Sequence, residues 1–215
     1  MHQVKAYILL MQGENLLPFL DGLSSNLVDG PCTTVFTDRA AKVIDACEVI
    51  VLGDNVALVG YGDVKERLSR HLLEHRLGQN IEIRDISDLN KVFIGNRIDN
   101  VPSTATVHQG WFGTVCIVGN DVEFVSTWSK EDWLEHRVTH AIPFAGHEIT
   151  SKHHPFACGL GPLVHGNKGC YIGQEVLVRM RSRGKFGHRM VVKENPAPGA
   201  TTVGKTHSLC IVRDQ

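Results

Sequence analysis

The spacing of apolar and polar residues predicts a mixed α and β structure in the first ninety residues. Apolar positions at helical spacing predict a first helix over 14–22. Runs rich in β-branched residues predict strands at 33–37, 42–52, 56–60 and 81–86. The turn residues Gly53-Asp54-Asn55 separate the second of these strands from the third, and this arrangement is typical of a hairpin.

The clearest helix of the sequence follows this hairpin. Asp63 and Glu66 have the spacing of a capping box, which indicates where the helix begins. Gly78 is placed where a C-terminal cap is expected. One face of the helix is apolar and consists of Val64, Leu68, Leu72 and Leu73.

The same order of elements recurs after a shift of 66 residues. Residues 53–59 align with 119–125, and the capping pair Asp63 and Glu66 aligns with Ser129 and Asp132. A matched order of strand, turn, strand and capped helix indicates an internal duplication. Two such units are expected to join their sheets, with helices on the outer faces and a ligand pocket at their junction.

Beyond His140 the sequence changes character. Residues 141–173 are rich in glycine and proline and predict a long irregular segment, which in a compact domain is often functional. A helix is predicted over 174–183, ending at Gly184, and short β-prone runs follow. The predicted fold is therefore α+β, with a duplicated ferredoxin-like core in 1–185 and a short, truncated β-rich C-terminal segment in 186–215.

Composition and charge narrow the function. Apolar residues make up 42% of the chain and the net charge is −1, so a buried core is expected and a global attraction to nucleic acid or membranes is not. No stretch resembles a signal peptide or a membrane span, and the six cysteines contain no C-x-x-C pair. We expect a cytoplasmic protein with reduced thiols that binds neither membranes nor, directly, nucleic acid.

Cys170 is the most conspicuous of these thiols. It follows Gly169, lies close to Lys168 and precedes the predicted helix by a few residues. A cation and a helix N-terminus both favour a thiolate, so this position predicts a nucleophilic or metal-binding sulfur. A structural cysteine packed beneath a loop is the alternative, and the residues alone leave it open.

The residues Lys168-Gly169-Cys170-Tyr171-Ile172-Gly173-Gln174-Glu175 resemble the K-G-C-Y-x-G-Q-E signature of the YgfZ family, the folate-binding relatives of the glycine-cleavage aminomethyltransferase. Weaker similarity to that family covers segments 19–26 and 137–149. The resemblance implies a tetrahydrofolate cavity and a role in sustaining iron–sulfur proteins, including those that modify tRNA. It implies Cys170 as the functional thiol. It also implies that folate is held by Lys168, Gly169, Tyr171, Gln174, Glu175, Arg179 and Arg137.

The chain departs from these relatives at two acidic positions and in length. The aminomethyltransferases carry paired acids where this chain has Asp45 and Ala46, and the family often has an acid where this chain has Ala157. The C-terminal part is also shorter than that of the family. Aminomethyl transfer, with Asp45 handling the proton on the folate amine, is therefore the alternative hypothesis, and a folate-binding accessory protein for iron–sulfur cluster assembly or repair is favoured.

Histidines and arginines supply two weaker signals. The pairs His71/His75 and His136/His140 have the spacing of two zinc ligands on a helix, but neither carries the carboxylate of H-E-x-x-H, and no metal site is expected. The basic run 179–189 is consistent with a solvated helix face or with an anion site for a folate tail or RNA phosphate, and the sequence does not separate these.

Overall fold

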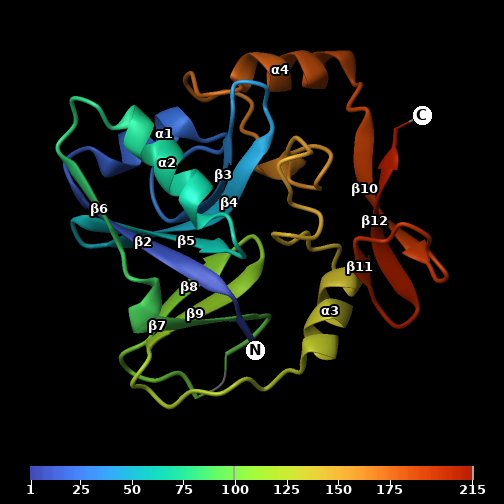
Figure 1. The fold of residues 1–215 in the computed structure, drawn as a ribbon, viewed down its shortest axis with the longest axis horizontal. Helices are drawn as coiled ribbons and strands as arrows, with labels where there is room; N and C mark the ends of the chain where they lie inside the picture. Colours follow the sequence, from blue (N-terminus) through green and yellow to red (C-terminus); the bar gives the residue numbers. More distant parts are fainter. Residues whose placement is uncertain (99, 215) are drawn as a thin grey trace.

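The computed structural model describes residues 1–98 and 100–214, and in them it has three antiparallel sheets and four α-helices (Figure 1). The α+β class predicted from the sequence is confirmed. None of the helices in these residues has the length and hydrophobicity that crossing a bilayer requires.

A five-stranded sheet in the order β3-β4-β5-β2-β6 forms the middle layer. Its strands are β2 (Ala6–Gly13), β3 (Cys32–Thr37), β4 (Val43–Leu52), β5 (Asn55–Tyr61) and β6 (Ile81–Asp85). The predicted hairpin joins β4 to β5, with Leu52 opposite Asn55. The first eight residues of β4 are all buried, because this strand has packed layers on both faces.

Helices α1 (Leu16–Leu23) and α2 (Lys65–His75) cover one face of this sheet. Leu20, Leu68 and Leu72 of these helices are fully buried against apolar side chains of β2, β3, β4 and β5. The predicted capping box of α2 is wrong: Val64 occupies the N-cap without a side-chain hydrogen bond, and Asp63 pairs with Lys5 instead.

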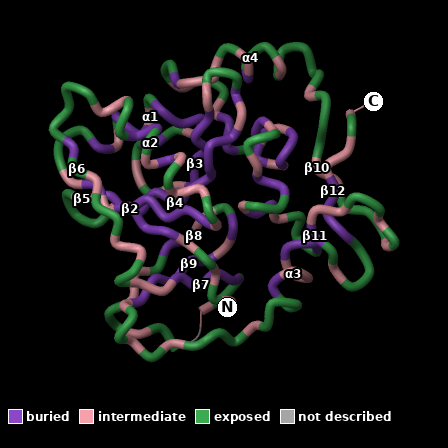
Figure 2. The backbone as a smooth tube through the Cα atoms, in the orientation of Figure 1, coloured by how far each residue is buried: buried purple, intermediate pink, exposed green. Residues whose placement is uncertain are grey.

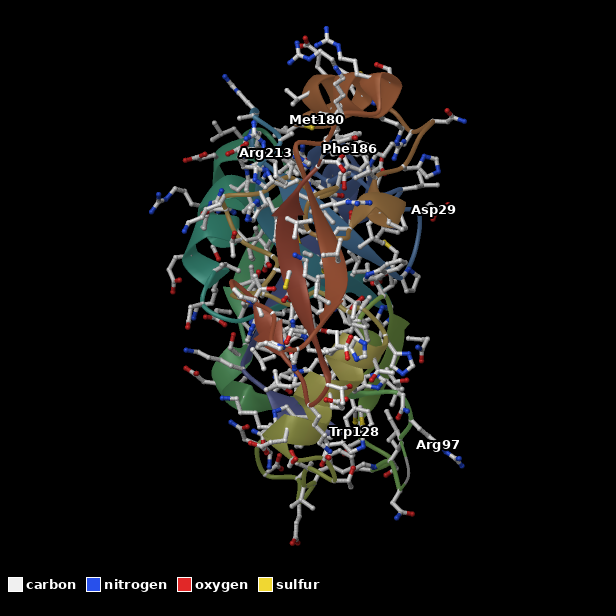
Figure 3. All side chains as sticks on the ribbon, turned by 90° about the vertical axis from the view of Figure 1, so that its right-hand side faces the viewer. Asp29, Arg97, Trp128, Met180, Phe186 and Arg213 are labelled. Atoms are coloured by element: carbon white, nitrogen blue, oxygen red, sulfur yellow. The ribbon has the colours of Figure 1, made fainter. Side chains whose placement is uncertain are left out.

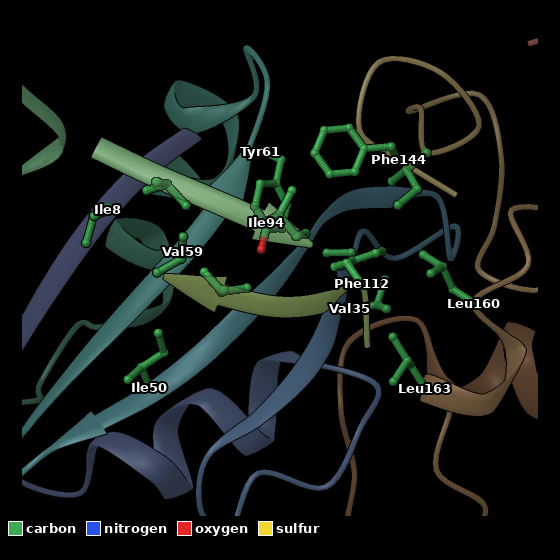
Figure 4. Packing of buried hydrophobic residues seen from close by; sticks show 14 of the residues in the cluster. Ile8, Val35, Ile50, Val59, Tyr61, Ile94, Phe112, Phe144, Leu160 and Leu163 are labelled. Carbon is green, nitrogen blue, oxygen red and sulfur yellow. The ribbon is translucent and has the colours of Figure 1, made fainter. Parts of the chain in front are cut away.

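A second sheet, in the order β1-β7-β9-β8, packs on the opposite face. Its strands are β1 (His2–Val4), β7 (Asn90–Gly95), β8 (Thr106–Gly110) and β9 (Gly113–Gly119), and a short 3₁₀ turn, η1 (Ser87–Leu89), leads into β7. The two sheets do not share a strand, so the expected joined sheet is not observed. Tyr61, Phe112 and Phe144 pack edge-to-face or tilted between them (Figure 4), and apolar side chains fill the interface where a pocket was expected.

The structure contains only part of the proposed internal repeat. Helix α3 (Lys130–Thr139) has the predicted capping box, in which the Ser129 hydroxyl accepts from the Asp132 N–H and the Asp132 carboxylate accepts from the Ser129 N–H. However, residues 122–125, which were aligned with β5, belong to no strand. The ferredoxin-like duplication is therefore not shown by this structure.

Residues 141–173 form the predicted irregular segment, interrupted by one 3₁₀ turn, η2 (Gly161–Leu163). Helix α4 (Gln174–Arg183) follows and ends at Gly184, as predicted. The strands β10 (His188–Glu194), β11 (Thr202–Val203) and β12 (His207–Arg213) make a third sheet, which faces the viewer in Figure 3 with α4 above it and α3 below. Most of α4 and β10 is exposed or half-buried (Figure 2).

Candidate functional site

Lys168 anchors the loop that contains Cys170 to helix α1. Its side chain is fully buried, and its ammonium donates to Oδ1 of Asp21 at 2.7 Å. It also donates to three backbone carbonyls, those of Asp21, Ser24 and Asn26, at 2.6 to 2.8 Å. With all its donors used inside the protein, Lys168 has a structural role, and its part in holding a cofactor stays a prediction.

Gly173 and Ile172 attach the same loop to the end of β3. The hydroxyl of Thr37 donates to the carbonyl of Ile172 at 2.7 Å. Gly173 has φ +85°, and a side chain on it would collide with Thr37 and with the backbone of Asp38. The signature therefore needs glycine at this position for two reasons, a left-handed conformation and a close contact.

Tyr171 packs inward and Cys170 does not. Tyr171 is 8% exposed and lies in a small apolar cluster with Ala41, Val164 and Leu177. Cys170, Gly169, Glu175 and Arg179 are exposed, and Gln174 is half-buried and donates to the Gly169 carbonyl at 3.4 Å. The signature thus combines two inward-facing side chains, Lys168 and Tyr171, with an exposed thiol between them. A folate-binding role for Gly169, Gln174, Glu175 and Arg179 stays a prediction.

The other five cysteines are less accessible than Cys170. Cys47, Cys116, Cys158 and Cys210 are buried and Cys32 is half-buried. Burial raises the pKa of Cys32 to about 11 and that of Cys158 to about 12, and it also raises the pKa values of Cys47 and Cys116. A raised pKa removes thiolate from these four cysteines at neutral pH, and exposure singles out Cys170 among the six.

Asp45 lies beneath the helices and not at the interface between the sheets. Its carboxylate accepts from the hydroxyl of Tyr7 and, at 2.8 Å, from the N–H of Ala46. Burial raises its pKa to about 7, against the lowering effect of these hydrogen bonds. Because neighbouring residues of a strand point to opposite faces, Ala46 faces the second sheet and Asp45 faces α1 and α2. The structure therefore does not bring Asp45 together with Cys170 in one cluster.

A second buried carboxylate, Glu48, was missed by the sequence analysis. Glu48 is fully buried on the face of β4 that meets the second sheet. Its Oε2 accepts from the Thr33 hydroxyl at 2.5 Å and lies 3.2 Å from Nε2 of His108, while Oε1 has no partner among the described residues. The only signal in the sequence was one acid within the apolar run of β4. Burying a carboxylate oxygen without a hydrogen-bond partner lowers the stability of the folded protein, so Glu48 is a candidate functional residue.

Arg137 has a structural environment as well. It is fully buried, and its Nη2 donates to Oε2 of Glu148 at 2.5 Å and to the hydroxyl of Thr202 at 2.9 Å. Its Nε donates to the carbonyl of Ile142 at 3.2 Å. Arg137 therefore ties α3 to the segment that follows it and to β11, and it does not face the Cys170 loop as a free cation.

A candidate ligand cavity lies at the tip of the β8–β9 hairpin. This hairpin cavity has a volume of about 440 Å³. It is lined by Asn96, Gln109, Gly110, Trp111, Gly113, His136, His140, Ala141 and Ile142. Trp111 is 42% exposed, which leaves its indole available for stacking. These residues come from the second sheet and its turns, and from α3 and the residues that directly follow it, so the cavity is not a junction between the expected halves.

The pair His71 and His75 lies within helix α2, as predicted, whereas His140 of the second pair is the C-cap residue that follows α3. The ring centroids of His71 and His75 are 4.6 Å apart, and those of His136 and His140 are 4.5 Å apart. Within residues 1–98 and 100–214, no group of three or more His, Cys, Asp or Glu side chains is already arranged to hold a metal ion.

No protein-family model and no curated protein matches the chain in sequence. In structure, it is similar to glycine cleavage system aminomethyltransferase T from Bartonella henselae, with a TM-score of 0.77 and 12% sequence identity. The match covers 98% of this chain and 77% of that chain. At this identity the likeness concerns the fold, and the resemblance to YgfZ-type proteins stays a prediction. The chain has an aminomethyltransferase T-like fold.

Proposed function

We propose that this protein binds a tetrahydrofolate and supports iron–sulfur proteins through the thiol of Cys170. The observation that carries the proposal is the likeness of nearly the whole chain to an aminomethyltransferase T, at a TM-score of 0.77. The proposed assignment to the accessory group, which serves iron–sulfur cluster assembly or repair and iron–sulfur-dependent tRNA modification, rests on the K-G-C-Y-x-G-Q-E residues 168–175.

The hairpin cavity is the proposed folate site. Its volume of about 440 Å³ is within the range of small-molecule sites, which is roughly 300–1,000 Å³. The exposed indole of Trp111 would stack on a heterocyclic ring, and the amides of Asn96 and Gln109 would pair with its polar edge. This location replaces the expected one near Cys170, because apolar side chains fill the interface between the two sheets.

Cys170 is the proposed reactive group of the accessory function. Iron–sulfur clusters are held by cysteine thiolates, so an exposed thiol on an anchored loop is suited to contact a cluster or a cluster protein. Lys168 and Gly173 hold the loop on either side of it, which keeps the sulfur at the surface.

Aminomethyl transfer is the less favoured function. A transferase needs an acid or base within hydrogen-bond reach of the folate amine. Asp45 is buried under α1 and α2. Ala46 faces the second sheet, and its methyl side chain can act neither as an acid nor as a base. Release of ammonia from an aminomethylated carrier protein in a single turnover, abolished by Asp45→Asn, would restore the transferase.

Calorimetric titration with tetrahydrofolate tests the binding. We expect Trp111→Ala to weaken binding at least tenfold, whereas Leu77→Ala, the truncation of an exposed apolar side chain outside the cavity, should leave it unchanged. Cys170→Ser should bind folate normally but fail to sustain the activity of iron–sulfur enzymes in cells. If no heat is released at millimolar folate, the binding proposal is wrong. If iron–sulfur enzymes in cells keep their full activity with Cys170→Ser, the proposed role of the thiol is wrong.

A further inference from the structure

A second cavity brings two histidines and two acids together beside the Cys170 loop. It has a volume of about 390 Å³ and lies between α2 and the turn that joins β3 to β4. Asp38, Arg39, His71, Glu74 and His75 line it together with Ile172, which belongs to the signature loop. The hairpin cavity and the Cys170 thiol account for none of these side chains.

The two histidines are arranged with free ring nitrogens. The imidazole rings of His71 and His75 are 4.6 Å apart and inclined by 47°. Nδ1 of His75 is 2.7 Å from the carbonyl oxygen of His71. A carbonyl only accepts, so Nδ1 carries the proton and Nε2 of His75 is left with its lone pair. Such a hydrogen bond from one ring nitrogen is the usual way in which a protein orients a histidine that binds a metal through the other.

His71 supplies the second free nitrogen. The residue is 8% exposed, and its Nε2 is buried with no hydrogen-bond partner among the described residues. Burial, and then the charges of His75 and Arg67, lower the pKa of His71 to about 4, so the ring is neutral at physiological pH. A buried nitrogen without a partner is unfavourable, and coordination to a metal would satisfy it.

Asp38 faces these histidines across the cavity. Its Oδ1 accepts from the N–H groups of Ala40 and Lys42 at 2.9 and 2.8 Å. Its Oδ2 is only loosely paired, at 4.0 Å from Nη2 of Arg67. The helix contributes a further acid, because His71-Leu72-Leu73-Glu74-His75 follows the H-x-x-E-H order found in one class of zinc enzymes.

We propose that His71 and His75 bind a divalent zinc ion beside Ile172 of the signature loop, with Asp38 as a carboxylate ligand and water at the remaining positions. Two histidines and a carboxylate with an open position form a known zinc ligand set. Among the described residues no three such side chains already surround a common point, so Asp38 would reach the ion through Oδ2 after a change of its side-chain conformation. The affinity is therefore lower than that of a closed four-ligand site.

The second histidine pair provides an internal control. His136 and His140 have the same spacing and a ring separation of 4.5 Å. They line the hairpin cavity, whose described lining contains no carboxylate. If helical spacing were sufficient, both pairs would bind zinc equally. If the facing acid matters, as proposed, the pair on α2 binds more tightly.

The test is calorimetric titration of the chelator-treated Cys170→Ser protein with Zn²⁺, since this background removes the exposed thiol as a competing ligand. We expect one tight site per chain, weakened at least tenfold by His75→Gln and by His71→Gln, and weakened several-fold by Asp38→Asn. The double variant His136→Gln/His140→Gln should retain it. The visible absorption of bound Co²⁺ would report a nitrogen and oxygen ligand set that disappears in the same variants.

His75 is half-buried, so His75→Gln is the variant least able to act through misfolding, and circular dichroism checks each variant. The proposal is overturned if His75→Gln binds zinc as tightly as the parent. It is also overturned if the tight site disappears with His136→Gln/His140→Gln, or if the parent binds no zinc.

Discussion

The ammonium group of Lys168 lies 2.7 Å from Oδ1 of Asp21, although 147 positions separate the two residues in the chain. Asp21 belongs to α1, and its Oδ1 also accepts from the N–H of Val28 at 2.8 Å. One ion pair thus joins the first helix, the segment between α1 and β3 and the loop that contains Cys170. The position of the thiol therefore depends on the packing of the N-terminal third of the protein.

Lys168→Met should lower the free energy of unfolding by about 3 kcal/mol. The substitution would leave the Asp21 carboxylate and three backbone carbonyls without the ammonium that donates to them. Urea unfolding measures the free energy, and limited proteolysis should show new cleavage near residues 166–172. Lys185→Met, at an exposed position next to α4, is the control and should be within about 0.5 kcal/mol of the wild type. Equal stability of the two variants would show that the anchor is unimportant.

Cys170 should react with an alkylating reagent faster than any other cysteine at pH 7. It is exposed, whereas burial and then the charge of Glu48 raise the pKa of Cys32 to about 11. Mass spectrometry of the labelled peptides over a pH series gives the individual rates. Faster labelling of Cys32 than of Cys170 would contradict the exposure seen here.

Asp45 should make the free energy of unfolding fall as pH rises from about 4 to about 7. Burial raises its pKa in the folded protein from 3.8 to about 7, so the folded state keeps a proton that the unfolded state loses. The full effect is at most roughly 4 kcal/mol, from about 1.4 kcal/mol per unit of pKa. His71, whose pKa is lowered from 6.5 to about 4, acts in the opposite direction over the same range.

The two contributions are separated by variants. Urea unfolding of Asp45→Asn between pH 4 and 8 should lose the decline with pH, because asparagine imitates the protonated acid. His71→Gln should lose the opposing rise and make the decline steeper. A wild-type minus Asp45→Asn difference that does not change with pH would mean that Asp45 titrates at its ordinary pKa.

Gly110→Ala should be far more destabilising than Gly30→Ala. A methyl group at Gly110 would collide with both carboxylate oxygens of Glu48, whereas the space beside Gly30 is open. Neither glycine has a positive φ, so the comparison isolates the collision. We expect a loss of about 2 kcal/mol or more for Gly110→Ala and under about 0.5 kcal/mol for Gly30→Ala, both read from thermal or urea unfolding. Similar losses would mean that the β8–β9 hairpin moves freely away from Glu48.

Local signals in the sequence determined the elements whose causes are local. Helix α4 begins after Gly173 and ends at Gly184, and both glycines have positive φ, as residues that interrupt a helix often do. The β4–β5 hairpin follows from its turn residues, and the capping box of α3 follows from Ser129 and Asp132. The signature around Cys170 likewise identified the one exposed thiol.

Only the tertiary structure decided what each side chain faces. Both faces of β4 are buried, so its sequence does not alternate between polar and apolar residues. Without that alternation, the sequence cannot indicate that Asp45 and Glu48 face opposite sides of the sheet. The acceptors of the Lys168 ammonium come from residues 21–26, more than 140 positions away, and no local pattern around Lys168 indicates them. Asp38 likewise lies at the same cavity as His71 and His75, although more than 30 positions separate it from them in the sequence. Short-range periodicity records the conformation of a segment, whereas burial and pairing depend on contacts between segments that no local pattern encodes.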